Sequence, residues 1–154
     1  MAIDLSTAGV TVQYAAETTA GTKPTTGYTK IPGIKAIPDL NPEPSGLDTT
    51  TLEATEWKTY IQGLKDPGGA IQFTANNTEE FQTAWATLVE AYNTAIAGGK
   101  ETWFAVIVPG LTNSFYFSGK PSDLGLSAIE VDAVLEIQPY ITPHKIGGWD
   151  TAPQ

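Results

Sequence analysis

Residues 78–99 read TEEFQTAWATLVEAYNTAIAGG, and they predict the one convincing helix of the chain. We expect it over about residues 78–97, because Asn77 can cap its start, two glutamates suit its positive first turn and Gly98-Gly99 can end it. Apolar side chains recur along it at helical spacing: Phe81, Trp85, Leu88, Val89, Tyr92 and Ile96. An isolated amphipathic helix is marginal in water, so this stripe must pack on a sheet.

The segments on either side of the predicted helix carry strand patterns. Before it, residues 70–74 place Ile71 and Phe73 on one face. After it, residues 102–108 are apolar on both faces, as a covered central strand is, and a turn leads into residues 114–118. The predicted fold class is therefore mainly β (α+β), a β-sandwich or barrel with one flanking helix.

Residues 127–138 show the cleanest alternation in the chain and predict a further strand. One face would be apolar, with Ile129, Val131, Ala133, Leu135 and Ile137. The other face would carry three carboxylates, from Glu130, Asp132 and Glu136. Like charges spaced so regularly require water beside them, and either an outer surface or a water-filled channel would supply it.

The length of 154 residues predicts a single domain over residues 1–154. Within it, residues 35–48 hold Pro38, Pro42 and Pro44 and predict an extended loop, because proline fixes the backbone and lacks a donor. Residues 144–154 follow Pro143 and are rich in glycine and proline, so we expect a loosely held C-terminal tail.

The charge of the chain restricts its partners. It has 17 acidic residues and 8 basic ones, a formal net charge of −9, and every basic residue is a lysine. Gripping nucleic acid or an anionic membrane usually requires clustered Lys and Arg, so neither kind of binding is expected. No apolar run approaches the ~20 residues of a membrane span.

No sequence pattern supports catalysis, a cofactor or a metal site. The chain has no cysteine, which excludes disulfides and thiolate chemistry. Its one histidine, His144, lies in the predicted tail, where an exposed loop residue is the simpler interpretation than a catalytic base. Neither a phosphate-binding glycine loop nor a nucleophile elbow is present. We therefore expect that the protein is not an enzyme.

The four tryptophans divide into two pairs. Trp85 lies on the apolar stripe of the helix and Trp103 in the most apolar strand, so both are expected in the core. Trp57 and Trp149 are candidate interface aromatics, because tryptophan is enriched where partners dock.

Three motifs follow one another in the middle of the chain: IPGIKAIPDL at residues 31–40, LDTTTL at 47–52 and YIQGLKDPGG at 60–69. In this order, and followed by a strand and the helix, they resemble the tail tube (major tail) protein family of long-tailed, non-contractile bacteriophages. The resemblance covers about residues 28–143. It implies a tail tube fold, a β-sandwich with a flanking helix.

The resemblance also implies a function. Subunits of such a protein form hexameric rings, joined through the edges of their sheets, and the rings stack into a hollow tube through which DNA is ejected. The expected partners are copies of the chain itself and the tape-measure, tail-tip (initiator) and terminator proteins. DNA would pass without specific binding, and no membrane is involved. The expected location is the tail of the virion, after synthesis in the host cytoplasm.

On this interpretation Glu130, Asp132 and Glu136 would face the lumen. The extended loop would reach a neighbouring subunit or ring through Ile37, Pro38, Asp39, Leu40, Pro42, Pro44, Leu47 and Asp48. Two alternatives remain open. One is a monomeric β-sandwich that binds carbohydrate or protein, and the other is a different virion part, such as a tail terminator.

Overall fold

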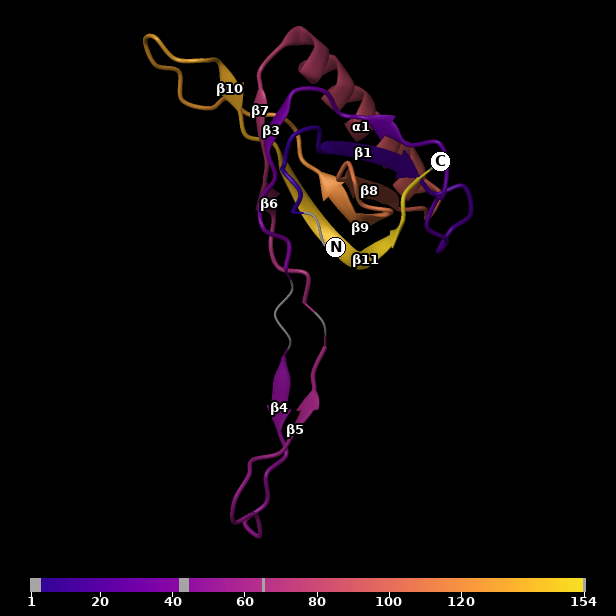
Figure 1. Cartoon of the computed structure of the whole chain (residues 1–154). Helices are drawn as coiled ribbons and strands as arrows, with labels where there is room; N and C mark the ends of the chain where they lie inside the picture. The colour runs from indigo at the N-terminus through magenta and orange to yellow at the C-terminus, as the bar shows by residue number, and fades with distance from the viewer. Residues whose placement is uncertain (1–3, 42–44, 65, 154) are drawn as a thin grey trace.

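A computed structural model describes residues 4–41, 45–64 and 66–153 of the chain. It is mainly β, with a curled sheet and one helix, as the sequence predicts (Figure 1). The main sheet is antiparallel, and its described strands follow the order β2-β1-β8-β9-β11-β6. Their bounds are β1 Thr11–Ala16, β2 Thr29–Lys30, β6 Ile71–Gln72, β8 Thr102–Ile107, β9 Asn113–Pro121 and β11 Tyr140–Thr151.

Two smaller antiparallel sheets complete the described strands. One has the order β10-β7-β3, and the other pairs β4 with β5 at a distance from the rest of the molecule (Figure 1). Their bounds are β3 Ile34–Ala36, β4 Gly46–Asp48, β5 Tyr60–Gln62, β7 Thr74–Asn76 and β10 Glu136–Ile137.

The helix α1 spans Glu79–Ala97, close to its predicted range. Its cap is Thr78 instead of Asn77: the Thr78 hydroxyl accepts a hydrogen bond of 3.1 Å from the backbone N–H of Phe81. The buried stripe consists of Phe81, Trp85, Leu88, Tyr92 and Ala95. Ile96, which the sequence analysis placed on the stripe, is 43% exposed, because the buried face reaches the sheet through Ala95 in the last turn.

The main core lies between α1 and one face of the curled sheet. The helix contacts β1, β8 and β9, and its aromatic side chains meet Phe104 and Phe117, whose rings stack at 5.2 Å between centroids. The indole N–H of Trp85 donates to the carbonyl of Ser122, at 2.8 Å, so its burial leaves no orphaned donor. Both predicted core tryptophans are buried, Trp103 on the other face of the sheet.

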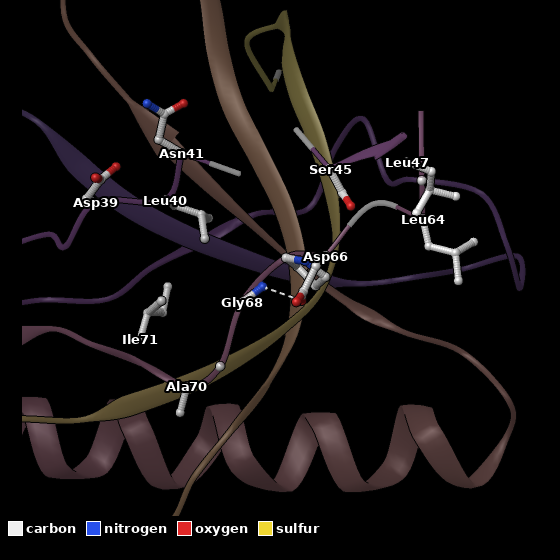
Figure 2. Close-up of a pocket in the computed structure, with 13 residues that line it drawn as sticks. Asp39, Leu40, Asn41, Ser45, Leu47, Leu64, Asp66, Gly68, Ala70 and Ile71 are labelled. Carbon is white, nitrogen blue, oxygen red and sulfur yellow. Dashed lines mark hydrogen bonds between the residues drawn. The ribbon is translucent and has the colours of Figure 1, made fainter. Parts of the chain in front are cut away.

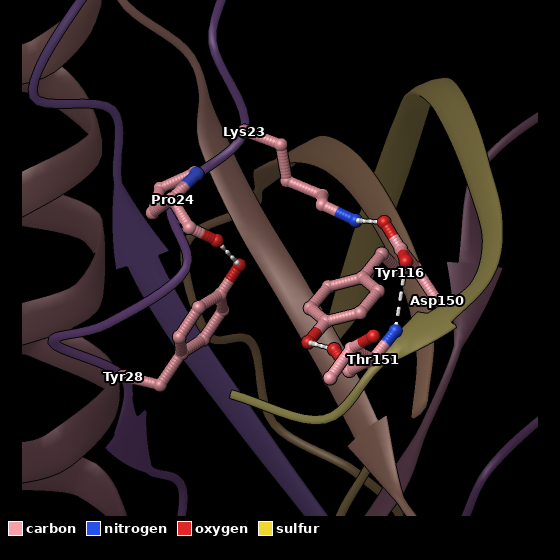
Figure 3. Close-up of polar contacts among 6 residues, drawn as sticks. All are labelled: Lys23, Pro24, Tyr28, Tyr116, Asp150 and Thr151. Atoms are coloured by element: carbon pink, nitrogen blue, oxygen red, sulfur yellow. Dashed lines mark hydrogen bonds and ion pairs between the residues drawn. The ribbon is translucent and has the colours of Figure 1, made fainter. Parts of the chain in front are cut away.

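A loop at residues 17–28 covers that other face, and Figure 3 shows how it is fastened. Side chains alternate across a strand, so Trp103 and Tyr116 point away from the main core and form a second small cluster with Tyr28. The Tyr28 hydroxyl donates to the carbonyl of Pro24 at 2.9 Å. Lys23 lies above the ring of Tyr116, 3.9 Å from its centroid (Figure 3).

The predicted strand at residues 127–138 is wrong over most of its length. Only Glu136 and Ile137 are in a strand, β10, and residues 127–135 are irregular. Asp132 has φ of +61°, a left-handed conformation that interrupts an extended strand. Alternation alone was misleading because no strand of the described residues lies beside residues 127–135 to make a ladder with them.

The C-terminal segment also differs from its prediction as a loose tail. Strand β11 continues to Thr151 and pairs with β9 from Ile141↔Pro121 to Thr151↔Asn113. The proline and glycines that suggested a tail are accommodated by two irregularities of the register, between Pro143 and Lys145 and between Ile146 and Gly148.

The predicted extended loop at residues 35–48 is partly regular. It begins in β3 and ends with β4, and residues 37–41 between them belong to no strand. Pro42 and Pro44 lie outside the described residues.

Candidate assembly surfaces

The most prominent surface is a long hairpin, here called the arm, which consists of β4, a tip at residues 49–59 and β5 (residues 46–62). It projects far from both other sheets (Figure 1). Its register pairs Leu47 with Ile61 and Asp48 with Tyr60. At the tip, the Thr49 N–H donates to the Thr59 carbonyl at 2.8 Å, and the Thr59 N–H donates to the Thr50 hydroxyl at 2.9 Å.

The arm exposes large apolar side chains along its whole length. Leu52 and Trp57, in the tip, are 106% and 81% exposed. Leu47, Tyr60 and Ile61, in its two strands, are also exposed. A two-stranded hairpin is at best marginally stable in water, and this one buries almost nothing. A large exposed apolar surface of this kind usually marks a protein interface.

The base of the arm frames an open hollow, shown in Figure 2. Leu40, Leu64 and Ile71 contribute apolar surface, and Asp39 and Asp66 contribute carboxylates. The Asp66 carboxylate accepts a hydrogen bond of 2.9 Å from the Gly68 N–H, which fixes the turn leading into β6 (Figure 2). Of the predicted inter-subunit residues, Asp39, Leu40 and Leu47 line this hollow, and Asp48 follows Leu47 in β4.

A smaller apolar groove lies beside this hollow, at the end of the curled sheet. Phe115, Val106 and Trp149 come from three adjacent strands and form its floor. The Trp149 ring meets Phe115 edge-on, with 5.5 Å between centroids, and still exposes 57% of its surface. Ile37 and Pro38, two more of the predicted inter-subunit residues, form the wall. Both candidate interface tryptophans, Trp57 and Trp149, are therefore accessible.

A second projecting segment, here called the acidic loop, covers residues 122–135. Its two ends are fastened: the Ser122 N–H donates to the Tyr140 carbonyl, and the Leu135 carbonyl accepts from the Asn77 N–H, both at 3.0 Å. Between these ends it exposes a group of apolar side chains: Leu126, Ile129, Val131, Val134 and Leu135. Val131, at 97%, is almost fully exposed.

The three predicted lumen carboxylates are not on one face of one strand. Glu130 and Asp132 lie in the acidic loop, whereas Glu136 lies in β10, where its carboxylate accepts from the Lys35 ammonium at 2.9 Å. The lumen position of these three residues stays a prediction. The strand alternation that suggested it is not present in the structure.

The two edge strands of the main sheet are short, so much of the backbone beside them is unpaired. Strand β6 pairs with β11 only at Tyr140 and Ile141, so most of the outer side of β11 has no strand beside it within the described chain. At the other end, β2 pairs with β1 only at Gln13 and Tyr14. Such unpaired edges are places where a strand of another chain can add.

The single histidine of the chain lies close to a carboxylate. His144 is near the Glu101 carboxylate, with 3.7 Å from Nδ1 to Oε1, and Lys145 lies 3.6 Å from the other oxygen of that carboxylate. Across the described ranges, no group of three or more metal-ligating side chains gathers. Nor does any helix there have the length and apolar character to cross a membrane.

One comparison, with solved structures, found a chain of similar fold. No protein-family model matches the chain, and a search of curated proteins found no match. Among solved structures, it is similar to a chain in the cryo-EM structure of the anti-feeding prophage (AFP) baseplate, 6-fold symmetrised, with a TM-score of 0.59 at 6% identity. The match covers 99% of this chain and 98% of that one. A second similar structure is a chain of the phage p2 baseplate in its activated conformation, with a TM-score of 0.46 at 10% identity. That match covers 91% of this chain and 45% of the other one.

Proposed function

We propose that this chain is a structural protein of a phage tail, and specifically a tail tube subunit that assembles into stacked hexameric rings. The observation that carries the proposal is the arm, whose exposed leucine, tryptophan and isoleucine side chains require a surface outside their own subunit. The fold, which a chain of a six-fold baseplate also has over nearly its full length, supports the same proposal.

The edges of the main sheet suggest how a ring would close. The outer side of β11 and the short edge strand β2 belong to opposite ends of one sheet. Pairing the first edge of one subunit with the second edge of the next is a head-to-tail contact, which closes into a ring when the rotation between subunits allows it.

The charge of the chain suits a conduit for DNA. With a net charge of −9 and no arginine, the surface repels phosphates overall, so DNA would slide without being held. The carboxylates of Glu130, Asp132 and Glu136 are the residues we propose for the lumen. Replacing all three with lysine should slow DNA ejection from tubes that still assemble, and unchanged ejection would contradict this assignment.

Negative-stain electron microscopy of the concentrated protein, alone and with purified tail-tip complexes, tests the function. We expect stacked rings or hollow tubes with sixfold end views. Closed rings that never stack would favour a terminator, and addition only to a baseplate would favour a baseplate component. A protein that stays monomeric under both conditions would contradict the proposal and favour the binding module.

A matched pair of variants tests whether assembly requires the arm. Leu52→Ser removes an apolar side chain from the tip, and Leu111→Ser removes an exposed leucine from the body of the protein. We expect the first variant to lose assembly while its thermal unfolding stays unchanged, and the second to assemble normally. Equal behaviour of the two would show that the arm has no special part in assembly.

A further inference from the structure

Trp149 forms an aromatic projection at the edge of the main sheet where β11 lies. Its ring meets Phe115 edge-on, with 5.5 Å between centroids, and 57% of its surface is exposed. No described strand pairs with β11 on its outer side at this position. A tryptophan side chain has few rotatable bonds and loses little freedom on docking, which is one reason why it often anchors interfaces.

An open hollow lies near the opposite edge of the same sheet, beside β2. Its lining comes from the end of β2 and from the start of α1: Lys30, Pro32, Glu79, Glu80, Thr83 and Ala84. Pro32 and Ala84 contribute apolar surface, and the two glutamates contribute carboxylates that can accept hydrogen bonds. Because tryptophan combines an apolar ring with one N–H donor, the hollow has the chemistry to receive an indole.

The projection and the hollow lie on the same face of the sheet. Trp149 is paired with Phe115, which packs against the main core, and α1, which covers that core, also lines the hollow. One row of directly paired or hydrogen-bonded residues crosses the sheet from beside the hollow to the projection: Ile31, Val12, Val106, Phe115 and Trp149. A sheet that continued from copy to copy along this row would therefore bring Trp149 beside Pro32 of the next copy.

We propose that Trp149 of one copy inserts into the hollow beside β2 of the next copy. Its ring packs on Pro32 and Ala84, and its indole N–H donates to the carboxylate of Glu79 or Glu80. In the head-to-tail contact of the proposed function, on which this inference rests, the inserted indole fixes how the two sheet edges are aligned. The exposed ring of Trp149 then has a partner that the fold of a single copy does not provide.

Cysteine crosslinking tests this contact directly, because the chain has no cysteine of its own. Thr151 is exposed and lies two residues after Trp149 in β11, so Thr151→Cys labels this face of the edge without removing the indole. Thr83→Cys labels the hollow. Assemblies grown from an equal mixture of the two variants are treated with a short bismaleimide and separated under denaturing conditions. We expect a covalent dimer from the mixture and none above background from either variant alone.

Thr94→Cys is the matched control, because Thr94 is another exposed threonine of α1, near the opposite end of the helix. Mixed with Thr151→Cys, it should give no dimer above background. Assemblies that are visible by electron microscopy but give no dimer with Thr83→Cys, or as much dimer with Thr94→Cys, would overturn the contact and leave the proposed function standing. A wild-type protein that never assembles would overturn both.

Blocking the hollow gives an independent readout that leaves Trp149 in place. Thr83→Arg puts a long side chain at the hollow, and Thr94→Arg makes the same charge change at the other end of α1. We expect Thr83→Arg to raise the protein concentration needed for assembly at least about thirtyfold, the loss expected for one interface hot spot, with unchanged thermal unfolding. Thr94→Arg should assemble like the wild type, and equal assembly of the two variants would overturn the proposed insertion.

Variants of the anchor itself test the chemistry of the contact. Trp149→Ala should impair assembly about as much as Thr83→Arg does. Trp149→Phe keeps an aromatic ring but lacks the N–H donor, so it should impair assembly less than Trp149→Ala. Assembly of Trp149→Ala at the wild-type concentration would overturn the role of Trp149 as the anchor.

Discussion

The ammonium of Lys23 lies 2.6 Å from Oδ2 of Asp150, a residue 127 positions later in the sequence (Figure 3). This pair fastens the loop at residues 17–28 to the end of β11. The same end is held by the Tyr116 hydroxyl, which donates to the Thr151 carbonyl at 2.6 Å. Burial, and to a lesser degree Asp150, raises the pKa of Tyr116, so its phenol stays a neutral donor at ordinary pH.

The ion pair between Lys23 and Asp150 makes the free energy of unfolding depend on pH. The hydrogen bond from Lys23, followed by the Thr151 N–H, lowers the pKa of Asp150 below its ordinary value. A lowered folded-state pKa means that the stabilisation is fully present above the unfolded-state pKa, near 3.9, and is lost as the pH falls through the folded-state value. Asp150→Asn should therefore lower the melting temperature at pH 7, and the difference from wild type should shrink as the pH falls through the lowered pKa of Asp150.

Asp123→Asn is the matched control, because it removes one carboxylate from an exposed site. We expect its melting temperature to follow the wild type across the same pH range. If both variants lowered the melting temperature equally at pH 7, overall charge and not the contact with Lys23 would be the cause.

Two helix positions distinguish the apolar stripe predicted from the sequence from the helix face that is buried in the structure. Leu88 and Ile96 both belong to the predicted stripe, but Leu88 is fully buried while Ile96 is 43% exposed. Leu88→Ala should cost about 2–5 kcal/mol of the free energy of unfolding, since it leaves a cavity against the sheet. Ile96→Ala should cost less than about 1 kcal/mol. Urea denaturation measures both values, and equal losses would contradict the observed orientation of the helix.

The helix was predictable because its signals are local. A cap, an apolar stripe and a glycine stop all lie within residues 77–99, and they act whatever the rest of the chain does. The error of one residue at the cap arises because Asn77 and Thr78 are both good capping residues, and only the backbone geometry distinguishes them.

The irregularity of residues 127–135 was not predictable from alternation. Alternation with a period of two indicates that a segment is compatible with a sheet. It does not indicate that a neighbouring strand is present to pair with the segment. Here β7 ends its pairing at Asn76, because α1 begins three residues later. Within the described part of the chain, the rest of the segment therefore has no strand to pair with. The apolar residues that looked like a core face remain exposed in the acidic loop.

The strand β11 was missed for the opposite reason: its partner is distant in sequence. Gly119 of β9 lies so close to β11 that an added Cβ would meet the Thr142 carbonyl oxygen at 2.8 Å and the Cα of Pro143 at 3.2 Å. Gly119→Ala should therefore push the two strands apart and cost about 1–3 kcal/mol. A loosely held tail would instead yield to the new methyl group at little cost.

Gly125→Ala is the control for that experiment, because a Cβ there would meet nothing within 4 Å. We expect its unfolding midpoint in urea to stay within experimental error of the wild type. A midpoint for Gly119→Ala that also stays unchanged would contradict the pairing of β9 with β11 at this position.

The selection of Trp57 and Trp149 as interface aromatics stays a prediction. It rested only on their absence from a helical stripe or apolar strand, and the structure shows that both side chains are exposed. The arm itself was missed, although two short strand patterns separated by a polar bridge are present around residues 49–61. Its pairing depends on the threonines Thr49, Thr50 and Thr59, whose hydrogen bonds no hydrophobic pattern reveals.

Those threonines give the last prediction. Asp48 accepts a hydrogen bond of 2.9 Å from the Thr50 N–H, and hydrogen bonds from the side chain and backbone of Thr50, in that order, lower the pKa of its carboxyl group. Thr50→Val removes the hydroxyl and keeps the N–H, so the pKa of Asp48 should rise toward its ordinary value but not reach it. Thr59→Val is the control, since the Thr59 hydroxyl pairs with that of Thr49 and not with Asp48. Carboxyl carbon chemical shifts followed during an acid titration measure each pKa, and a Thr50→Val variant that titrates like the wild type would contradict the hydrogen bonding at the base of the arm tip.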